Sequence, residues 1–139
     1  MKSYETIDHT ADIGIRVRGK NLKELFKNSA RAMFDQMTTA PQRLPRTGRK
    51  TIKVEVFAEN INDLLLRWLS ELLSLGECKD IVFTDFKIIK LTDRQLKGSA
   101  AGFPRKYFKY KTEIKAVTYH ELSVNQKKKQ CSAQVIFDV

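Results

Sequence analysis

The sequence contains few of the residues that build disulfide-linked or zinc-dependent scaffolds. Its 139 residues include only two cysteines and two histidines. Cys78 and Cys131 form no CxxC pair, which argues against a disulfide framework and for a reducing compartment. With His9 and His120 as the two histidines, a zinc centre with four Cys or His ligands is not expected. The chain must therefore fold by burying apolar side chains, and residues 1–139 are long enough for one domain.

Sequence features typical of membrane insertion, nucleotide binding and nucleophilic catalysis are also missing. The opening "MKSYETIDHT" has no apolar core of a signal peptide, and no apolar run approaches the ~18 residues that span a bilayer. We therefore expect a cytoplasmic protein without membrane association. Neither GxxxxGK[ST] nor GxGxxG occurs, so the standard glycine-rich phosphate loops are absent. No serine or cysteine stands in a recognisable nucleophile motif, and nothing in the sequence assembles an autonomous enzyme.

Acidic residues are outnumbered, with 16 Asp and Glu against 26 Lys and Arg and a net charge of +10. This excess favours acidic partners such as RNA, nucleotides or an acidic protein face, although solubility alone also explains it. In "PRKYFKYK", residues 104–111, cations could contact phosphates while an aromatic ring stacks on a base. Strand alternation would instead turn the aromatics inward and the lysines outward without any function. The segment "NQKKKQ", residues 125–130, predicts a polar hairpin turn.

The apolar residues that are present recur with two distinct periods. Alternation over residues 13–17 predicts a half-buried strand. Apolar residues then recur at helical spacing, which predicts a helix over about 22–37. Asn21 is a candidate N-cap, and Glu24 three residues later completes the pattern of a capping box.

A second helix is predicted within "DLLLRWLSELLSLG", where leucines and Trp68 form an apolar stripe that packs in the core. Asn60 or Asn62 could cap its start, and Gly76 is expected to stop it. The remaining strands are predicted in "TIKVEVFA", "IVFTDFKIIKL", "RQLKGSAAGF", "TEIKAVTYHELSV" and "QCSAQVIFDV". Each element has one apolar face to bury, so we expect an α+β fold: a two-layer sandwich of a mostly antiparallel β-sheet with two main helices.

Four motifs occur in series along the chain: "DHTADIGI", "LLLRWLSELL", "IKAVTYHEL" and the terminal "AQVIFDV". In this order, from about residue 4 to residue 139, the sequence resembles the archease family. The resemblance implies an accessory protein, not an enzyme, that assists an RtcB-type RNA-splicing ligase in tRNA splicing. Ligases of that type join RNA ends after intron removal through guanylylation of an active-site histidine. Archease-like proteins promote this activation and keep the ligase turning over.

The resemblance also implies a divalent-cation site formed by Asp12, Asp138 and Val139. A hard cation needs several oxygen ligands, so we expect calcium, with magnesium as the alternative. Val139 has no polar side chain, but as the last residue of this sequence it offers an α-carboxylate. Taken alone, Asp12 could instead be a turn-forming aspartate that binds nearby backbone N–H groups.

Three further residues are candidates for ligase activation or for supporting the cation site. Asp8 would share a face with Asp12 if the segment between them were extended, or it could hold His9 in place. His9 and His120 are each either ligands or hydrogen-bonded structural histidines.

Lys115 is a candidate for a different reason. Alternation in "EIKAVTYHEL" places Lys115 on one strand face with Val117 and Tyr119. If that face is buried, the ammonium needs a carboxylate or phosphate partner, because an unpaired buried charge is costly. The resemblance makes Lys115 a candidate functional residue.

Two other classes of function compete with that of a ligase activator. The first is an RNA-binding module that uses residues 104–111, and RNA affinity without ligase and with a steep salt dependence would favour it. The second is a metal-dependent phosphohydrolase, which phosphate release from nucleotides, lost with Asp12→Asn, would favour.

Overall fold

Antiparallel strands and two helices make up the structure, a computed structural model that describes residues 3–8, 12–41 and 43–139. The elements in chain order are β1 (Tyr4–Asp8), β2 (Asp12–Gly19), α1 (Leu22–Met37), β3 (Thr38–Thr39), β4 (Lys50–Phe57), α2 (Ile61–Lys79), β5 (Ile81–Leu91), β6 (Gln95–Pro104), the short 3-10 helix η1 (Arg105–Tyr107), β7 (Lys109–Tyr110), β8 (Ala116–Lys127) and β9 (Gln130–Asp138).

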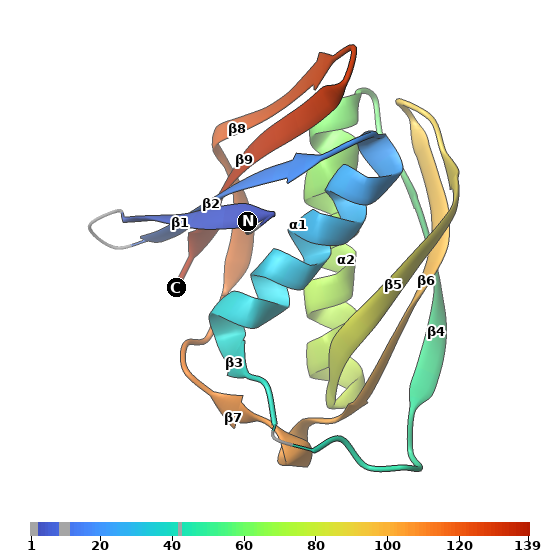
Figure 1. Cartoon of the computed structure of the whole chain (residues 1–139), viewed down its shortest axis with the longest axis vertical. Coiled ribbons are helices and arrows are strands. Elements are labelled where there is room, and N and C mark those ends of the chain that lie inside the picture. The colour runs from blue at the N-terminus through green and yellow to red at the C-terminus, as the bar shows by residue number, and fades with distance from the viewer. Residues whose placement is uncertain (1–2, 9–11, 42) are drawn as a thin grey trace.

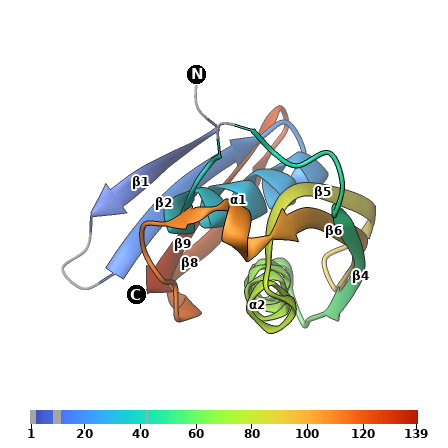
Figure 2. The ribbon, with the colours of Figure 1, turned by 90° about the horizontal axis from the view of Figure 1, so that it is seen from below.

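The strands form two main sheets with the helices between them (Figures 1 and 2). One sheet has the order β1-β2-β9-β8 and the other β4-β6-β5, while β3 pairs with β7. Helix α1 packs against β2 and β5, and α2 packs against β8 and β4. The α+β class, the antiparallel pairing and the two main helices are as the sequence predicts. The two-layer arrangement with one sheet is not what forms: the strands divide between two sheets, one on each side of the helix pair, which makes three layers.

Helix α1 begins and ends where its periodicity predicts. The Asn21 side chain accepts a hydrogen bond from the backbone N–H of Glu24 at 2.9 Å, which satisfies a donor that the first helical turn leaves unpaired. The Glu24 carboxylate in turn accepts from the backbone N–H of Lys20 at 3.3 Å. Nine of the 16 residues of α1 are buried, because the helix contacts a sheet on each side.

Helix α2 is capped by Asn60, whose side chain accepts from the backbone N–H of Asp63 at 2.9 Å. The expected stop at Gly76 is wrong, because the helix continues to Lys79 and ends at Asp80 in the left-handed conformation, with φ 59° and ψ 44°. Gly76 is buried inside the helix, where an added Cβ would lie 3.0 Å from the carbonyl oxygen of Ile81. This glycine therefore serves close packing of the helix against the start of β5.

The predicted core position of Trp68 is confirmed. Its side chain is fully buried, and its Nε1–H donates to the carbonyl oxygen of Phe26 at 3.0 Å, which joins α2 to α1. One hydrophobic cluster takes side chains from both helices and both main sheets. Among the described residues, neither helix has the combination of length and apolar character needed to cross a bilayer.

Candidate functional site

Asp12 and Asp138 come together at one end of the four-stranded sheet. Asp12 is the first residue of β2, Asp138 is the last residue of β9, and the two are direct cross-strand partners. Their neighbours Ile13 and Phe137 also pair, and both pack into the core. Because side chains alternate along a strand, Asp12 and Asp138 share the outer face of the sheet. Asp138 is exposed and Asp12 is half-buried.

The chemistry of this pair suits a hard cation. Opposed residues of an antiparallel pair have Cβ atoms ~4.5–5.5 Å apart, and like charges placed there destabilise the sheet. A divalent cation between the two carboxylates would offset that repulsion, and carboxylate oxygens are the ligands that calcium and magnesium prefer. The donor set therefore fits such an ion.

The main chain on either side of Asp138 is held firmly. Asp138 is in register with Ala116 on β8, and its carbonyl oxygen accepts from the backbone N–H of Lys115 at 2.7 Å. Val139 follows half-buried and packs against the hydrophobic core. The main-chain oxygens of Val139 are thus anchored next to the carboxylate pair.

Lys115 lies beside the pair, but its side chain is not buried. It precedes β8, which begins at Ala116, so the strand alternation predicted for it does not extend to this residue. The buried side chains here are Ile114 and Val117, whereas Lys115 and Tyr119 are exposed. The expectation of a buried ammonium is wrong, and what ties Lys115 to Asp138 is its main-chain N–H.

His120 lies in a large irregularity of β8. The register passes from Thr118 opposite Ile136 to Ser123 opposite Gln134, so residues 119–122 stand opposite a single residue of β9. Within this bulge Glu121 has φ 53°, an uncommon backbone conformation for a residue other than glycine. His120 is exposed in the bulge and does not stand opposite Asp138.

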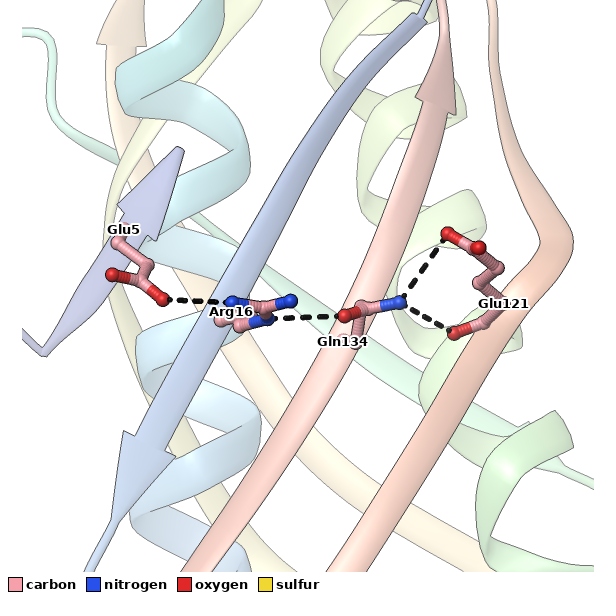
Figure 3. Close-up of polar contacts among 4 residues, drawn as sticks. All are labelled: Glu5, Arg16, Glu121 and Gln134. Atoms are coloured by element: carbon pink, nitrogen blue, oxygen red, sulfur yellow. Dashed lines mark hydrogen bonds and ion pairs between the residues drawn. The ribbon is translucent and has the colours of Figure 1, made fainter. Parts of the chain in front are cut away.

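A row of four polar side chains crosses the same outer face, from β1 to β8 (Figure 3). Arg16 contacts Glu5 at 3.4 Å and donates from Nε to Gln134 at 3.1 Å. Gln134 then donates to the carbonyl oxygen of Glu121 at 3.3 Å and to its carboxylate at 3.5 Å. The row fastens the β8 bulge to the rest of the sheet. Sequence reasoning missed it, since nothing in the sequence indicates which strands pair.

Asp8 is the last residue of β1, the strand that pairs with β2. The main chain of Asp8 pairs with Ile13, one position away from Asp12. The side chain of Asp8 and all of His9 lie outside the described residues, so the proposed contact between them is not tested. In the part of the chain that the structure describes, no three His, Cys, Asp or Glu side chains gather into a metal-binding group.

Strand β1, the neighbour of β2 in the sheet, is tied to helix α1. The Tyr4 hydroxyl donates to the Asp35 carboxylate at 3.1 Å. Burial, the Asp35 charge and this hydrogen bond together raise the pKa of Tyr4 to about 12. The contact anchors the edge strand that precedes the carboxylate pair.

This arrangement of two helices between antiparallel sheets defines a class of small proteins with solved structures. The solution structure of Methanobacterium thermoautotrophicum protein 1598 is similar along 100% of both chains, with a TM-score of 0.78 and 31% identity. The crystal structure of a Thermotoga maritima archease, described as a possible chaperone, has the same fold, with a TM-score of 0.63 and 24% identity over 97% of this chain and 96% of that one.

Sequence comparison identifies the family. Residues 4–139 match the Archease protein family (MTH1598/TM1083). Protein archease of Methanosarcina barkeri is 36% identical over 146 residues, covering 99% of this chain and 97% of that protein. Protein archease of Sulfolobus acidocaldarius is 38% identical over 133 residues, covering 91% of each. The chain therefore belongs to the archease family, which confirms the resemblance drawn from its four motifs.

Proposed function

We propose that this protein is an accessory factor that promotes guanylylation and turnover of an RtcB-type RNA-splicing ligase in tRNA splicing. The observation that supports this most is the Asp12–Asp138 pair, in which two residues singled out by the family resemblance become direct cross-strand partners. Asp138 and the neighbouring Lys115 are both exposed, so a protein partner can reach this end of the sheet.

The proposed site includes a divalent cation, calcium or alternatively magnesium, held by Asp12, Asp138 and the main-chain oxygens of Val139. Two opposed carboxylates favour such an ion because it removes their mutual repulsion. The packing of Val139 against the core supports its role, since an anchored ligand loses little conformational freedom on binding.

In this proposal the other candidate residues support the cation site or contact the ligase. The exposed ammonium of Lys115 would contact a carboxylate or phosphate of the ligase complex, next to the cation. Asp8, His9 and His120 stay candidates for orienting the site or the partner. The chain itself would carry out no ligation, and its contribution would be to position groups of the ligase.

Multiple-turnover RNA ligation by a purified RtcB-type ligase tests the proposal. We expect substoichiometric amounts of this protein to raise the number of turnovers, and Asp12→Asn to lose most of that effect. The matched control is Asp93→Asn, which neutralises an exposed aspartate in the turn between β5 and β6. No stimulation by the folded wild type would contradict the activator function. Phosphate release from nucleotides by this protein alone, abolished by Asp12→Asn, would favour a phosphohydrolase instead.

A further inference from the structure

The positive charge of the chain is concentrated in two segments. Residues 36–54 and 94–112 contain eleven of the 26 Lys and Arg residues and none of the 16 Asp and Glu residues. The rest of the chain therefore has fifteen basic and 16 acidic residues and is almost neutral. The net charge of +10 thus belongs to these two segments.

The fold brings parts of both segments to one end of the molecule, the lower end in Figure 1, which Figure 2 views from below. Strand β3 pairs with β7, and Lys50 at the start of β4 pairs with Gly102 near the end of β6. Between these points Gly48 approaches Pro104, since a Cβ added at Gly48 would lie 4.0 Å from the Pro104 Cδ. The connection from β3 to β4 therefore lies beside the connection from β6 to β7.

Residues 104–111 do not form the continuous strand that would explain their alternation. Strand β6 ends at Pro104, η1 makes a single turn, and β7 is only two residues long. The predicted alternation holds over residues 108–111, where Phe108 and Tyr110 pack against the core and Lys109 and Lys111 are exposed, but it fails at Tyr107, whose ring is exposed. Lys106 lies in η1 and Lys109 and Lys111 follow it, and all three side chains are exposed.

Two arginines at this end have partners within the fold. The Arg105 guanidinium lies over the Tyr110 ring, 4.0 Å from its centroid. Burial raises the pKa of Tyr110, and Arg105 acts in the opposite direction. Arg49 forms an ion pair with Asp85 at 3.3 Å. Both guanidinium groups are thus engaged in holding local structure.

Six other basic residues remain exposed at this end, and we name them the basic end: Arg43, Arg46, Lys50, Lys106, Lys109 and Lys111. Within the described parts of the chain, none of the six forms an ion pair. Their charges are therefore available to a ligand.

Aromatic and apolar surface lies among these cations. Tyr107 is 40% exposed, and the Lys106 Nζ lies 5.4 Å from the centroid of its ring. A pocket of about 270 Å³ is lined by Pro41, Leu44 and Phe108 among other residues, and its polar lining includes Arg31 and Asp35. The basic end thus offers both phosphate-binding charges and surfaces on which a base can stack.

We propose that the basic end binds a single-stranded polynucleotide, with phosphates on the six cations and a base on the Tyr107 ring. Duplex bases are stacked inside the helix and could not reach Tyr107, whereas a single strand presents its bases to aromatic side chains. An acidic protein face would also engage the charges, so polyglutamate is included in the test as the competing ligand. The basic end lies in the connections from β3 to β4 and from β6 to β8, outside the four-stranded sheet that carries Asp12 and Asp138, and the proposal does not depend on the proposed ligase function.

Fluorescence anisotropy with the full chain and a labelled oligonucleotide of about 12 nucleotides tests the proposal. RNA and DNA single strands of the same sequence are compared with the RNA duplex and with polyglutamate between about 50 and 200 mM salt. Six phosphate contacts predict that log K falls with log salt with a slope of about −4 for a single strand. Binding of either single strand supports the proposal. The strand that binds more tightly identifies whether RNA or DNA is the natural ligand.

The variant Lys106→Ser/Lys109→Ser/Lys111→Ser should weaken binding roughly tenfold or more and reduce the slope by about 2. The matched control, Lys127→Ser/Lys128→Ser/Lys129→Ser, removes the same charge from the β8–β9 turn at the opposite end of the molecule (Figure 1). It should change the slope little.

The aromatic contact is tested separately. Tyr107→Ala should weaken single-strand binding by roughly five- to hundredfold without changing the slope, because stacking releases no counterions, and Tyr107→Phe should restore it. Equal losses in the two lysine triples would overturn the proposal, since net charge alone would then explain binding. Equal affinity for the duplex or for polyglutamate, or no binding by the wild type at low salt, would also overturn it.

Discussion

Asp12 and Asp138 stand directly opposite each other on β2 and β9, although they lie near the two ends of the chain. Asp138 is also in register with Ala116 on β8, which places it between two strands. The pairing brings two carboxylates together on the outer face of the sheet, an arrangement that costs stability in the absence of a cation. The stability of the fold should therefore respond to divalent cations through these two residues.

The first prediction is that Asp12→Asn has opposite effects with and without cation. In a chelating buffer the substitution should raise the free energy of unfolding by about 0.2–1 kcal/mol, because it removes repulsion from Asp138. In calcium at about 100 times the wild-type Kd, the free energy of unfolding should rise by about 2.7 kcal/mol for the wild type and by less for the variant, whose affinity is weaker. Urea unfolding in both buffers measures the difference.

Asp93→Asn serves as the control and should behave like the wild type in both buffers. If calcium and magnesium stabilise the wild type and Asp12→Asn equally, Asp12 does not bind the cation.

The second prediction concerns Val139. In the proposed site the α-carboxylate of Val139 is a ligand, and appending a few residues would turn it into an amide and remove one negative charge. Cation affinity should fall but persist, because Asp12 and Asp138 remain, whereas Asp12→Ala or Asp138→Ala should weaken it more. Removing both Asp138 and Val139 should abolish binding. Calorimetric titration compares the forms, and equal affinities for the wild type and the extended chain would remove Val139 from the ligand set.

The third prediction is that Lys115→Ala lowers ligase activation without weakening the fold. Its side chain is exposed, so the free energy of unfolding should change by no more than about 0.5 kcal/mol. The hydrogen bond from the backbone N–H of residue 115 to the carbonyl oxygen of Asp138 is retained when the side chain is alanine. Lys128→Ala in the β8–β9 turn is the matched control. Unchanged stimulation by folded Lys115→Ala would show that the ammonium takes no part in activation.

The fourth prediction concerns the pH dependence that Tyr4 contributes. Its pKa is raised to about 12 in the folded chain, against 10.0 for an ordinary tyrosine. Between these values the unfolded chain loses the phenol proton while the folded chain retains it, so stability falls as the pH rises. Below pH 10 both states keep the proton and the contribution is fully present.

Urea unfolding at several pH values between 9 and 12 tests this expectation for Tyr4. The free energy of unfolding of the wild type should fall more steeply with pH than that of Tyr4→Phe, which has no group to titrate. Asp35→Asn should reduce the steepness, because it removes the neighbouring charge. Parallel pH profiles for the wild type and Tyr4→Phe would contradict the prediction.

The helices were predictable because local signals agree with the fold. Asn21 and Asn60 both accept hydrogen bonds at helix starts, as a capping residue should. The end of α2 was not predictable from Gly76, because a glycine can end a helix or permit close packing, and here the approach of Ile81 shows that it does the second. The division of the strands into two sheets was not predictable, since it depends on pairings between distant segments.

The candidate site was predictable only through the family resemblance. No periodicity indicates that Asp12 and Asp138 would be opposed, because cross-strand register depends on the whole sheet. Lys115 was wrongly expected on a buried face, since the position where β8 begins is not marked in the sequence. The β8 bulge at Glu121 was not predictable either. Its backbone has a positive φ, which a sequence normally indicates by a glycine and not by a glutamate.

The most direct test of the activator function is the rate at which a purified RtcB-type ligase becomes guanylylated, measured with labelled GTP in the absence of RNA. We predict that the wild-type protein accelerates formation of the covalent ligase–GMP adduct and that folded Asp138→Asn does not. The triple lysine-to-serine variant of residues 106, 109 and 111 should still accelerate it, because no RNA is involved. An unchanged guanylylation rate in the presence of the wild-type protein would contradict the account.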